Sequence, residues 1–255
     1  MIAPMNRSAP NGALETFCFT CRKALPCFTT CCAALKLVLT PYDILRLKNH
    51  LQLSSDTFLL RFTEVYADRA SGLPLIRLKM SHDTTGKCPF VTPEGCTVYP
   101  HRPGACRLYP LGRAVSKIYA RRRAGEYYFK VEEAHCLGWQ TQKKWTLKEW
   151  LSDQGLDVYN AMNEAYLQLS TGRPLSVLKK LGNRQLQMFY MACYNLDEFR
   201  RFLLKSTFRQ RFALPEEEWQ RLAVDDVALL GFAAHWLDFA LFGAPFKAPG
   251  DFTPQ

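Results

Sequence analysis

The ten cysteines constrain this chain of 255 residues more than any other feature, because all but one of them lie between residues 18 and 136. A disulfide framework would need an oxidising compartment and normally a much shorter chain. Residues 1–16 contain prolines and only isolated apolar side chains, so they lack the apolar segment of a secretory signal. Clustered thiols of this kind more often bind metal, and we expect a cytoplasmic metal-binding protein.

The cysteines form two groups along the sequence. One group is Cys21-x5-Cys27-x3-Cys31-Cys32 and the other is Cys88-x7-Cys96-x9-Cys106, with Cys136 standing alone further on. Neither group has the paired C-x2-C spacing of a zinc ribbon, so we expect ligands from both groups to be pooled. Thiolates are soft ligands for zinc, copper(I) and iron–sulfur clusters, and a structural zinc ion takes four ligands. The expected cofactor is zinc or iron, with an iron–sulfur cluster as one form of iron.

The adjacent pair Cys31-Cys32 is unusual, because neighbouring side chains diverge and rarely serve one tetrahedral ion. Three interpretations stay open: the two thiols serve different centres, one thiol is held in reserve, or the pair forms a redox-active disulfide. Further along, Pro93-Glu94-Gly95 predicts a turn that brings together the cysteines on either side of it. His101 and His135 are the histidines placed to replace a thiolate as ligand.

Positive charge is concentrated beside the second cysteine group. The chain has 33 Lys and Arg against 23 Asp and Glu, and the stretch 101–130 alone contains eight basic residues and one acid. Four thiolates on one zinc ion leave a net negative charge, so we expect Arg102 and Arg107 to lie near the ligands and balance it. For Arg121–Arg123 we expect a solvated hairpin tip, with nucleic-acid binding as the alternative.

Short helices and strands are predicted around the cysteines. Thr40–Asp43 has the cap, the proline and the acid that begin a helix. A second helix is expected from Ser55, and Val65 and Tyr66 continue its apolar spacing. Alternating patterns predict a small antiparallel sheet with strands at residues 75–80, 114–120 and 127–131.

After Trp145 the sequence changes to helical patterns. Thr146 and Glu149 form a capping box. The nearly apolar segment Val227–Phe246 contains Asp238, which would cost roughly 2.5–3.5 kcal/mol at the centre of a bilayer, so we expect a buried helix and no membrane partner. Helices with apolar faces are predicted at residues 157–170, 175–181, 184–194, 197–211, 216–223 and 225–242.

These patterns together predict an α+β chain. We expect a flexible leader at residues 1–17 and an irregular cysteine-cluster domain at residues 18–145 with a small antiparallel sheet and helices. A helical extension at residues 146–255 is expected to pack on that domain.

Several short blocks of the sequence carry a family pattern. They are Cys27–Cys32, Leu39–Leu47, Lys87–Phe90, Gly95–Tyr99, Arg102–Pro103, Cys106–Pro110 and Cys136–Trp139. In order and spacing the blocks resemble the YkgJ-type cysteine-cluster family, whose signature CxxCxxCC is stretched here at its N-terminal end. The resemblance covers about residues 18–139 and implies a zinc- or iron-chelating domain. It also implies eight candidate ligands, which are Cys21, Cys27, Cys31, Cys32, Cys88, Cys96, Cys106 and Cys136.

Three functions are compatible with these residues. We favour a binding or sensing module with saturated metal sites, because only the thiol clustering is strong evidence. The family includes the flagellin lysine N-methylase, so the resemblance implies S-adenosylmethionine-dependent protein methyl transfer as an alternative. An RNA-associated metalloprotein is the second alternative, and its affinity would fall with salt. A protein partner is also compatible, and no catalytic residue is assigned.

Overall fold

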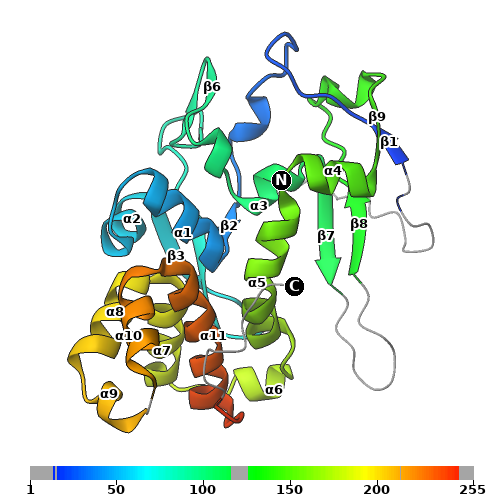
Figure 1. Cartoon of the computed structure of the whole chain (residues 1–255). Helices are drawn as coiled ribbons and strands as arrows, with labels where there is room; N and C mark the ends of the chain where they lie inside the picture. Colours follow the sequence, from blue (N-terminus) through cyan, green and yellow to red (C-terminus); the bar gives the residue numbers. More distant parts are fainter. Residues whose placement is uncertain (1–13, 15, 116–125, 213, 247–255) are drawn as a thin grey trace. The chain divides into compact units, whose positions relative to one another are not determined.

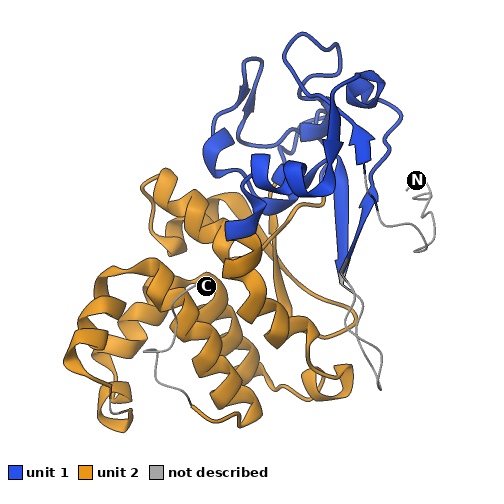
Figure 2. Cartoon of the chain, turned by 45° about the vertical axis from the view of Figure 1, so that its right-hand side comes forward, with its two compact units in different colours: residues 1–35, 80–158 blue, residues 36–79, 159–255 orange. Residues whose placement is uncertain are grey.

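The computed structural model describes residue 14 and residues 16–115, 126–212 and 214–246. In these residues the chain has the mixed α+β structure that the sequence predicts, with small antiparallel sheets and a helical C-terminal region (Figure 1). Figure 2 shows two compact units. The first unit consists of residues 1–35 and 80–158, and the second consists of residues 36–79 and 159–255.

The two units are interleaved along the sequence, since the chain enters the second unit at Lys36 and returns to the first at Met80. The reason is that the helices and strands of residues 36–79 pack against the C-terminal helices. The bounds of these two units therefore differ from those predicted for the leader (1–17), the cysteine domain (18–145) and the helical extension (146–255).

Short two-stranded antiparallel sheets organise the first unit. β1 (Thr16–Cys18) pairs with β9 (Lys144–Thr146), and β5 (Val91–Thr92) pairs with β6 (Gly95–Cys96). β7 (Leu111–Val115) pairs with β8 (Glu126–Lys130), which confirms the predicted antiparallel pair, although its first strand starts earlier. The strand predicted at residues 75–80 does not join this sheet and belongs to a separate one. The hairpin tip, with Arg121–Arg123, lies outside the described residues.

An aromatic cluster forms the core of the first unit. Phe17 and Phe19 are buried against Trp150 in edge-to-face contacts, with ring centroids 5.7 Å from that indole in each case. The Trp150 indole N–H donates to the carbonyl of Leu108 at 3.1 Å, so its polar group is satisfied inside the core. The helical segments of this unit are η1 (Thr30–Cys32), η2 (Tyr99–His101), α3 (Gly104–Leu108), η3 (Leu137–Gln140) and α4 (Leu147–Asp153).

A three-stranded antiparallel sheet belongs to the second unit, in the order β2 (Val38–Leu39), β4 (Pro74–Leu78) and β3 (Thr63–Ala67). Thr40 caps α1 (Pro41–His50) in a capping box with Asp43, as predicted. α2 (Ser55–Phe62) ends where β3 begins, so the expected helical continuation through Val65 and Tyr66 is wrong. These residues pair instead with Ile76 and Leu75, and such partners lie beyond the reach of a local periodicity.

The C-terminal helices complete the second unit. They are α5 (Leu156–Thr171), α6 (Leu175–Leu178), α7 (Asn183–Tyr194), α8 (Leu196–Lys205), α9 (Phe208–Arg211), α10 (Glu216–Val224) and α11 (Asp226–Phe242). The single helix expected at 197–211 is divided, because Ser206 is extended and its hydroxyl accepts from the Phe208 N–H. None of the helices in the described residues is long and apolar enough to cross a membrane. α11 buries Phe232 and Trp236 in the core.

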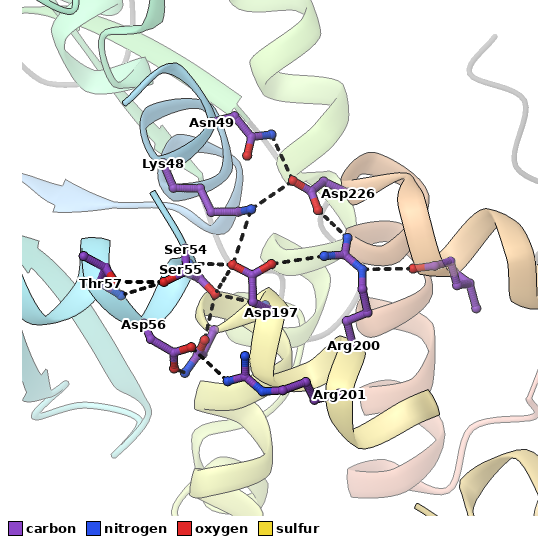
Figure 3. A network of polar contacts seen from close by, with 12 residues as sticks. Lys48, Asn49, Ser54, Ser55, Asp56, Thr57, Asp197, Arg200, Arg201 and Asp226 are labelled. Atoms are coloured by element: carbon purple, nitrogen blue, oxygen red, sulfur yellow. Dashed lines mark hydrogen bonds and ion pairs between the residues drawn. The ribbon is translucent and has the colours of Figure 1, made fainter. Parts of the chain in front are cut away.

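A partly buried ionic network connects the elements of the second unit (Figure 3). Asp226 accepts from Lys48 at 3.0 Å and also from Arg200. Asp197 accepts from Arg200 at 3.0 Å and from the backbone N–H of Ser55 at 2.6 Å. Partial burial alone would raise the pKa of Asp226, but the hydrogen bond from Arg200 and those from its other donors hold that pKa at about 2. The network fixes α1 and α2 to α8 and α11.

Candidate metal centre

Four cysteines from two distant segments of the first unit line one small pocket. Cys21, Cys27 and Cys31 lie in the segment that follows β1, and Cys136 is the residue immediately before η3. The backbone N–H of Leu137 donates to the Cys27 sulfur at 3.3 Å, which ties the two segments together. The structure thus joins three members of the first sequence group to the isolated cysteine.

The thiols in this pocket act on one another electrostatically. Burial raises the pKa of Cys21 to about 11, and the charges of Cys31, Cys27 and Cys136 act in the same direction. The pKa of Cys31 is raised by its hydrogen bond with Cys32 and by burial. Several thiolates therefore oppose each other's ionisation here, and a bound cation is the group that would offset this repulsion.

The pocket region also contains groups that the sequence analysis missed. The Tyr109 hydroxyl donates to Glu133 at 3.0 Å, and Glu133 lies 3.3 Å from the His135 imidazole. Burial and a hydrogen bond with Cys136 raise the pKa of Tyr109. His135 and Tyr109 line the pocket, so the expectation that His135 stands close to the thiols agrees with its position. Their spacing gives a signal in retrospect, because each lies within three residues of a cysteine.

The second cysteine group is organised by the β5–β6 hairpin. Val91 pairs with Cys96, and the Val91 N–H donates to the carbonyl of Cys88 at 3.2 Å. The turn predicted at residues 93–95 is therefore present and folds this segment back on itself. Burial raises the pKa of Cys88, and the Cys96 charge acts in the same direction. Cys106 lies in α3.

The two arginines expected near the thiolates have different surroundings. Arg102 is buried, and desolvation lowers its pKa against the opposing charges of Tyr99, Cys106 and Cys96. Its guanidinium donates to the Tyr99 carbonyl at 2.7 Å and lies over the Tyr99 ring at 3.8 Å. Arg107 donates to the backbone carbonyls of Arg102, Gln154 and Pro100 at 3.1, 2.7 and 2.5 Å. Arg102 thus interacts with the charges of two cysteines, whereas these three hydrogen bonds of Arg107 all go to backbone carbonyls.

The adjacent cysteines lie in the 3-10 turn η1. Cys31 lines the pocket described above, while the carbonyl of Cys32 accepts from the Cys88 N–H at 2.8 Å. Thr29 and Ala34 flank the pair with φ of 66° and 55°, a left-handed backbone that is costly for residues with a Cβ. The Cys31 thiol thus lines the pocket and is hydrogen-bonded to the Cys32 thiol, while the backbone of Cys32 is bound to that of Cys88.

The structure does not by itself complete a coordination site. In the parts of the chain that it describes, no three His, Cys, Asp or Glu side chains have the geometry to hold a metal ion. The ten cysteines, all within those parts, form no disulfide. Cys18 is exposed in β1, and Cys193 is buried in α7 of the second unit as a packing residue, as expected. Coordination would require the pocket thiols to turn toward a shared point.

Fold and site together define an α+β protein with a thiol-lined pocket, and thiolates are ligands of soft metal ions. Residues 20–137 match the CxxCxxCC family model, whose description reads "Putative zinc- or iron-chelating domain". The match confirms the expected resemblance and spans all eight candidate ligands, but neither Cys18 nor Cys193. Comparison with curated proteins and with solved structures gives no match.

Proposed function

We propose that this chain is a binding or sensing module that holds zinc or iron through cysteine thiolates. The observation that carries the proposal is the pocket, in which Cys136 meets three cysteines from a segment more than a hundred residues earlier. A bound ion would supply positive charge that stabilises the thiolates and cross-links these segments. The proposed ligands are Cys21, Cys27, Cys31, Cys32, Cys88, Cys96, Cys106 and Cys136.

The chemistry of the thiolate ligands limits the choice of metal but does not select a single one. Cysteine thiolates suit a tetrahedral zinc ion and an iron–sulfur cluster alike. Arg102 supports an anionic centre, since its charge interacts with Cys96 and Cys106 inside the protein. We propose a reducing compartment such as the cytoplasm, because thiols persist there without forming disulfides.

We propose neither methyl transfer nor RNA binding for this chain. The described residues and the comparisons provide no observation that favours either activity. The basic run Arg121–Arg123, on which the RNA alternative depended, lies outside the described residues.

Metal and acid-labile sulfide analysis with an optical spectrum tests the proposal, on protein purified without oxygen and without affinity metals. We expect stoichiometric zinc, or iron with sulfide and a broad visible band. Cys27→Ala should lower the metal content, while Cys18→Ala, an exposed cysteine outside the matched residues, should leave it unchanged. Wild-type protein that holds neither metal and takes up neither on titration would refute the proposal.

A further inference from the structure

We infer that Tyr109 is a positioning residue of the pocket, whose hydroxyl holds the sulfur of Cys136 and is itself held by Glu133. This inference rests on the proposed function, in which Cys136 is a metal ligand. It adds a polar group that is not a cysteine and that acts on the metal only through one cysteine. The hydroxyl would therefore set how strongly the pocket binds its metal.

The hydroxyl of Tyr109 lies between a thiol and a carboxylate. Tyr109 and Cys136 both line the pocket, and the hydroxyl is hydrogen-bonded to the Cys136 sulfur. The same hydroxyl donates to Glu133 at 3.0 Å, and the His135 imidazole lies 3.3 Å from the same carboxylate oxygen. A chain of polar contacts therefore runs from Cys136 through Tyr109 and Glu133 to the exposed His135.

A phenol hydroxyl suits this place because it has one donor and two acceptor lone pairs. While it donates to Glu133, it can accept the hydrogen of the Cys136 thiol. When Cys136 is a thiolate ligand, the hydroxyl can turn and donate to the sulfur, and His135 is then the partner that Glu133 keeps. Tyr109 can thus hold the sulfur with or without a bound metal.

Backbone hydrogen bonds bring the three side chains together. The Val131 N–H donates to the Pro110 carbonyl at 2.8 Å, which joins the residue after Tyr109 to the segment that carries the other two. The Cys136 N–H donates to the Glu133 carbonyl at 2.9 Å and closes a turn, so the thiol and the carboxylate belong to one short segment. The contacts of the hydroxyl are therefore supported by the main chain on both sides.

The ring of Tyr109 has a packing role that is separate from the role of its hydroxyl. It contacts the buried Phe19 edge to face, with ring centroids 6.1 Å apart. Tyr109→Phe keeps this ring and removes only the hydroxyl, so it separates positioning from packing. Loss of a hydrogen bond that orients a metal ligand typically lowers metal affinity by about 10- to 100-fold.

Metal affinity in Tyr109→Phe tests the inference. The full chain is titrated with Co²⁺, Zn²⁺ and Fe²⁺ without oxygen, in competition with a chromophoric chelator, and the spectrum of the cobalt-loaded protein is recorded. We expect Tyr109→Phe to weaken binding by about 10- to 100-fold and to shift the sulfur-to-cobalt charge-transfer band. Tyr127→Phe, at an exposed position in β8, should match the wild type in both measurements. Wild-type affinity and an unchanged band in Tyr109→Phe would overturn the inference.

Double variants show through which cysteine the hydroxyl acts. Adding Tyr109→Phe to Cys136→Ala should cause no further loss of affinity, because the sulfur that the hydroxyl holds is already absent. Adding it to Cys21→Ala should cause the full loss. Equal losses in the two backgrounds would identify a general effect on the fold and overturn the inference while metal binding itself stands.

A second comparison keeps every cysteine, in case either cysteine variant binds no metal. We expect Glu133→Ala to weaken binding less than Tyr109→Phe does. The double variant should bind metal as Tyr109→Phe alone does, because the carboxylate acts through the hydroxyl. Losses that multiply in the double variant would overturn the inference. A wild type that takes up none of the three metals would instead refute the proposed function, and this inference with it.

Discussion

At the scale of single residues, the cysteine pocket depends on one close approach between Gly138 and an aromatic ring. A Cβ placed on Gly138 would lie 2.5 Å from the Phe19 ring and 3.0 Å from the carbonyl oxygen of Thr20. Phe19 is buried against Trp139 and Trp150, so its ring has little room to move. Glycine is therefore required where η3 passes the core of the first unit.

We expect Gly138→Ala to lower the free energy of unfolding by about 1–3 kcal/mol through overpacking. Chemical denaturation of the metal-loaded protein measures this. Gly231→Ala in α11 is the matched control, because nothing lies within 4 Å of the added Cβ there. That control should be neutral or stabilising by up to about 1 kcal/mol, since alanine favours a helix. Equal unfolding energies for the two variants would contradict the close approach.

Asp226 makes stability depend on acid pH. Its folded pKa of about 2 lies below the ordinary 3.8, so its contribution is present above about pH 4 and is lost as the pH falls toward 2. The shift corresponds to about 2 kcal/mol. We expect Asp226→Asn to flatten the fall of unfolding free energy between pH 5 and pH 2, measured by denaturant titration. Glu217→Gln, at an exposed position, should keep the wild-type slope; the same slope in Asp226→Asn would refute the assignment.

At the scale of elements, local signals predict what local interactions determine. The capping boxes at Thr40 and Thr146 are readable because cap and partner lie three residues apart. The strand at Thr63–Ala67 is not readable in this way, because its pairing with residues 74–78 overrides an apolar spacing that also suits a helix. The candidate site divides likewise: the cysteines are visible in the sequence, but the meeting of Cys136 with Cys27 depends on the fold.

The first of these caps gives a direct test. Removing the hydroxyl in Thr40→Ala leaves the Asp43 N–H without its acceptor at the start of α1. We expect a loss of about 1 kcal/mol in unfolding free energy, measured by urea denaturation. Thr84→Ala, at an exposed position in a turn, should change it by less than about 0.5 kcal/mol. A loss at Thr40 no larger than that at Thr84 would show that the cap contributes nothing.

At the scale of the whole molecule, the two units differ in the interactions that can stabilise each of them. The sheets of the first unit have strands of two to five residues, and its core is one aromatic cluster. The second unit has longer helices, a three-stranded sheet and the ionic network around Asp197 and Asp226. The first unit therefore has more to gain from metal cross-links.

We expect removal of metal by a chelator to abolish amide protection in residues 16–35 and 80–155, while the helices of the second unit keep theirs. Hydrogen exchange followed by mass spectrometry resolves the two units, and re-addition of zinc or iron should restore protection. Magnesium is the control ion, because it prefers oxygen ligands and should restore nothing. Identical exchange before and after complete demetallation would show that metal does not stabilise the fold.

Because residues 36–79 belong to the second unit, the way they fold also affects how a metal site in the first unit can assemble. β2 and β4 are antiparallel neighbours, and Val38 lies opposite Arg77 in their register. The strand that leaves the first unit therefore runs beside the strand that returns to it. The entropy of closing a loop grows with the number of flexible residues between its ends. Once the second unit has folded, the connection between Cys32 and Cys88 behaves as a short tether, so these two cysteines have a high effective concentration relative to each other.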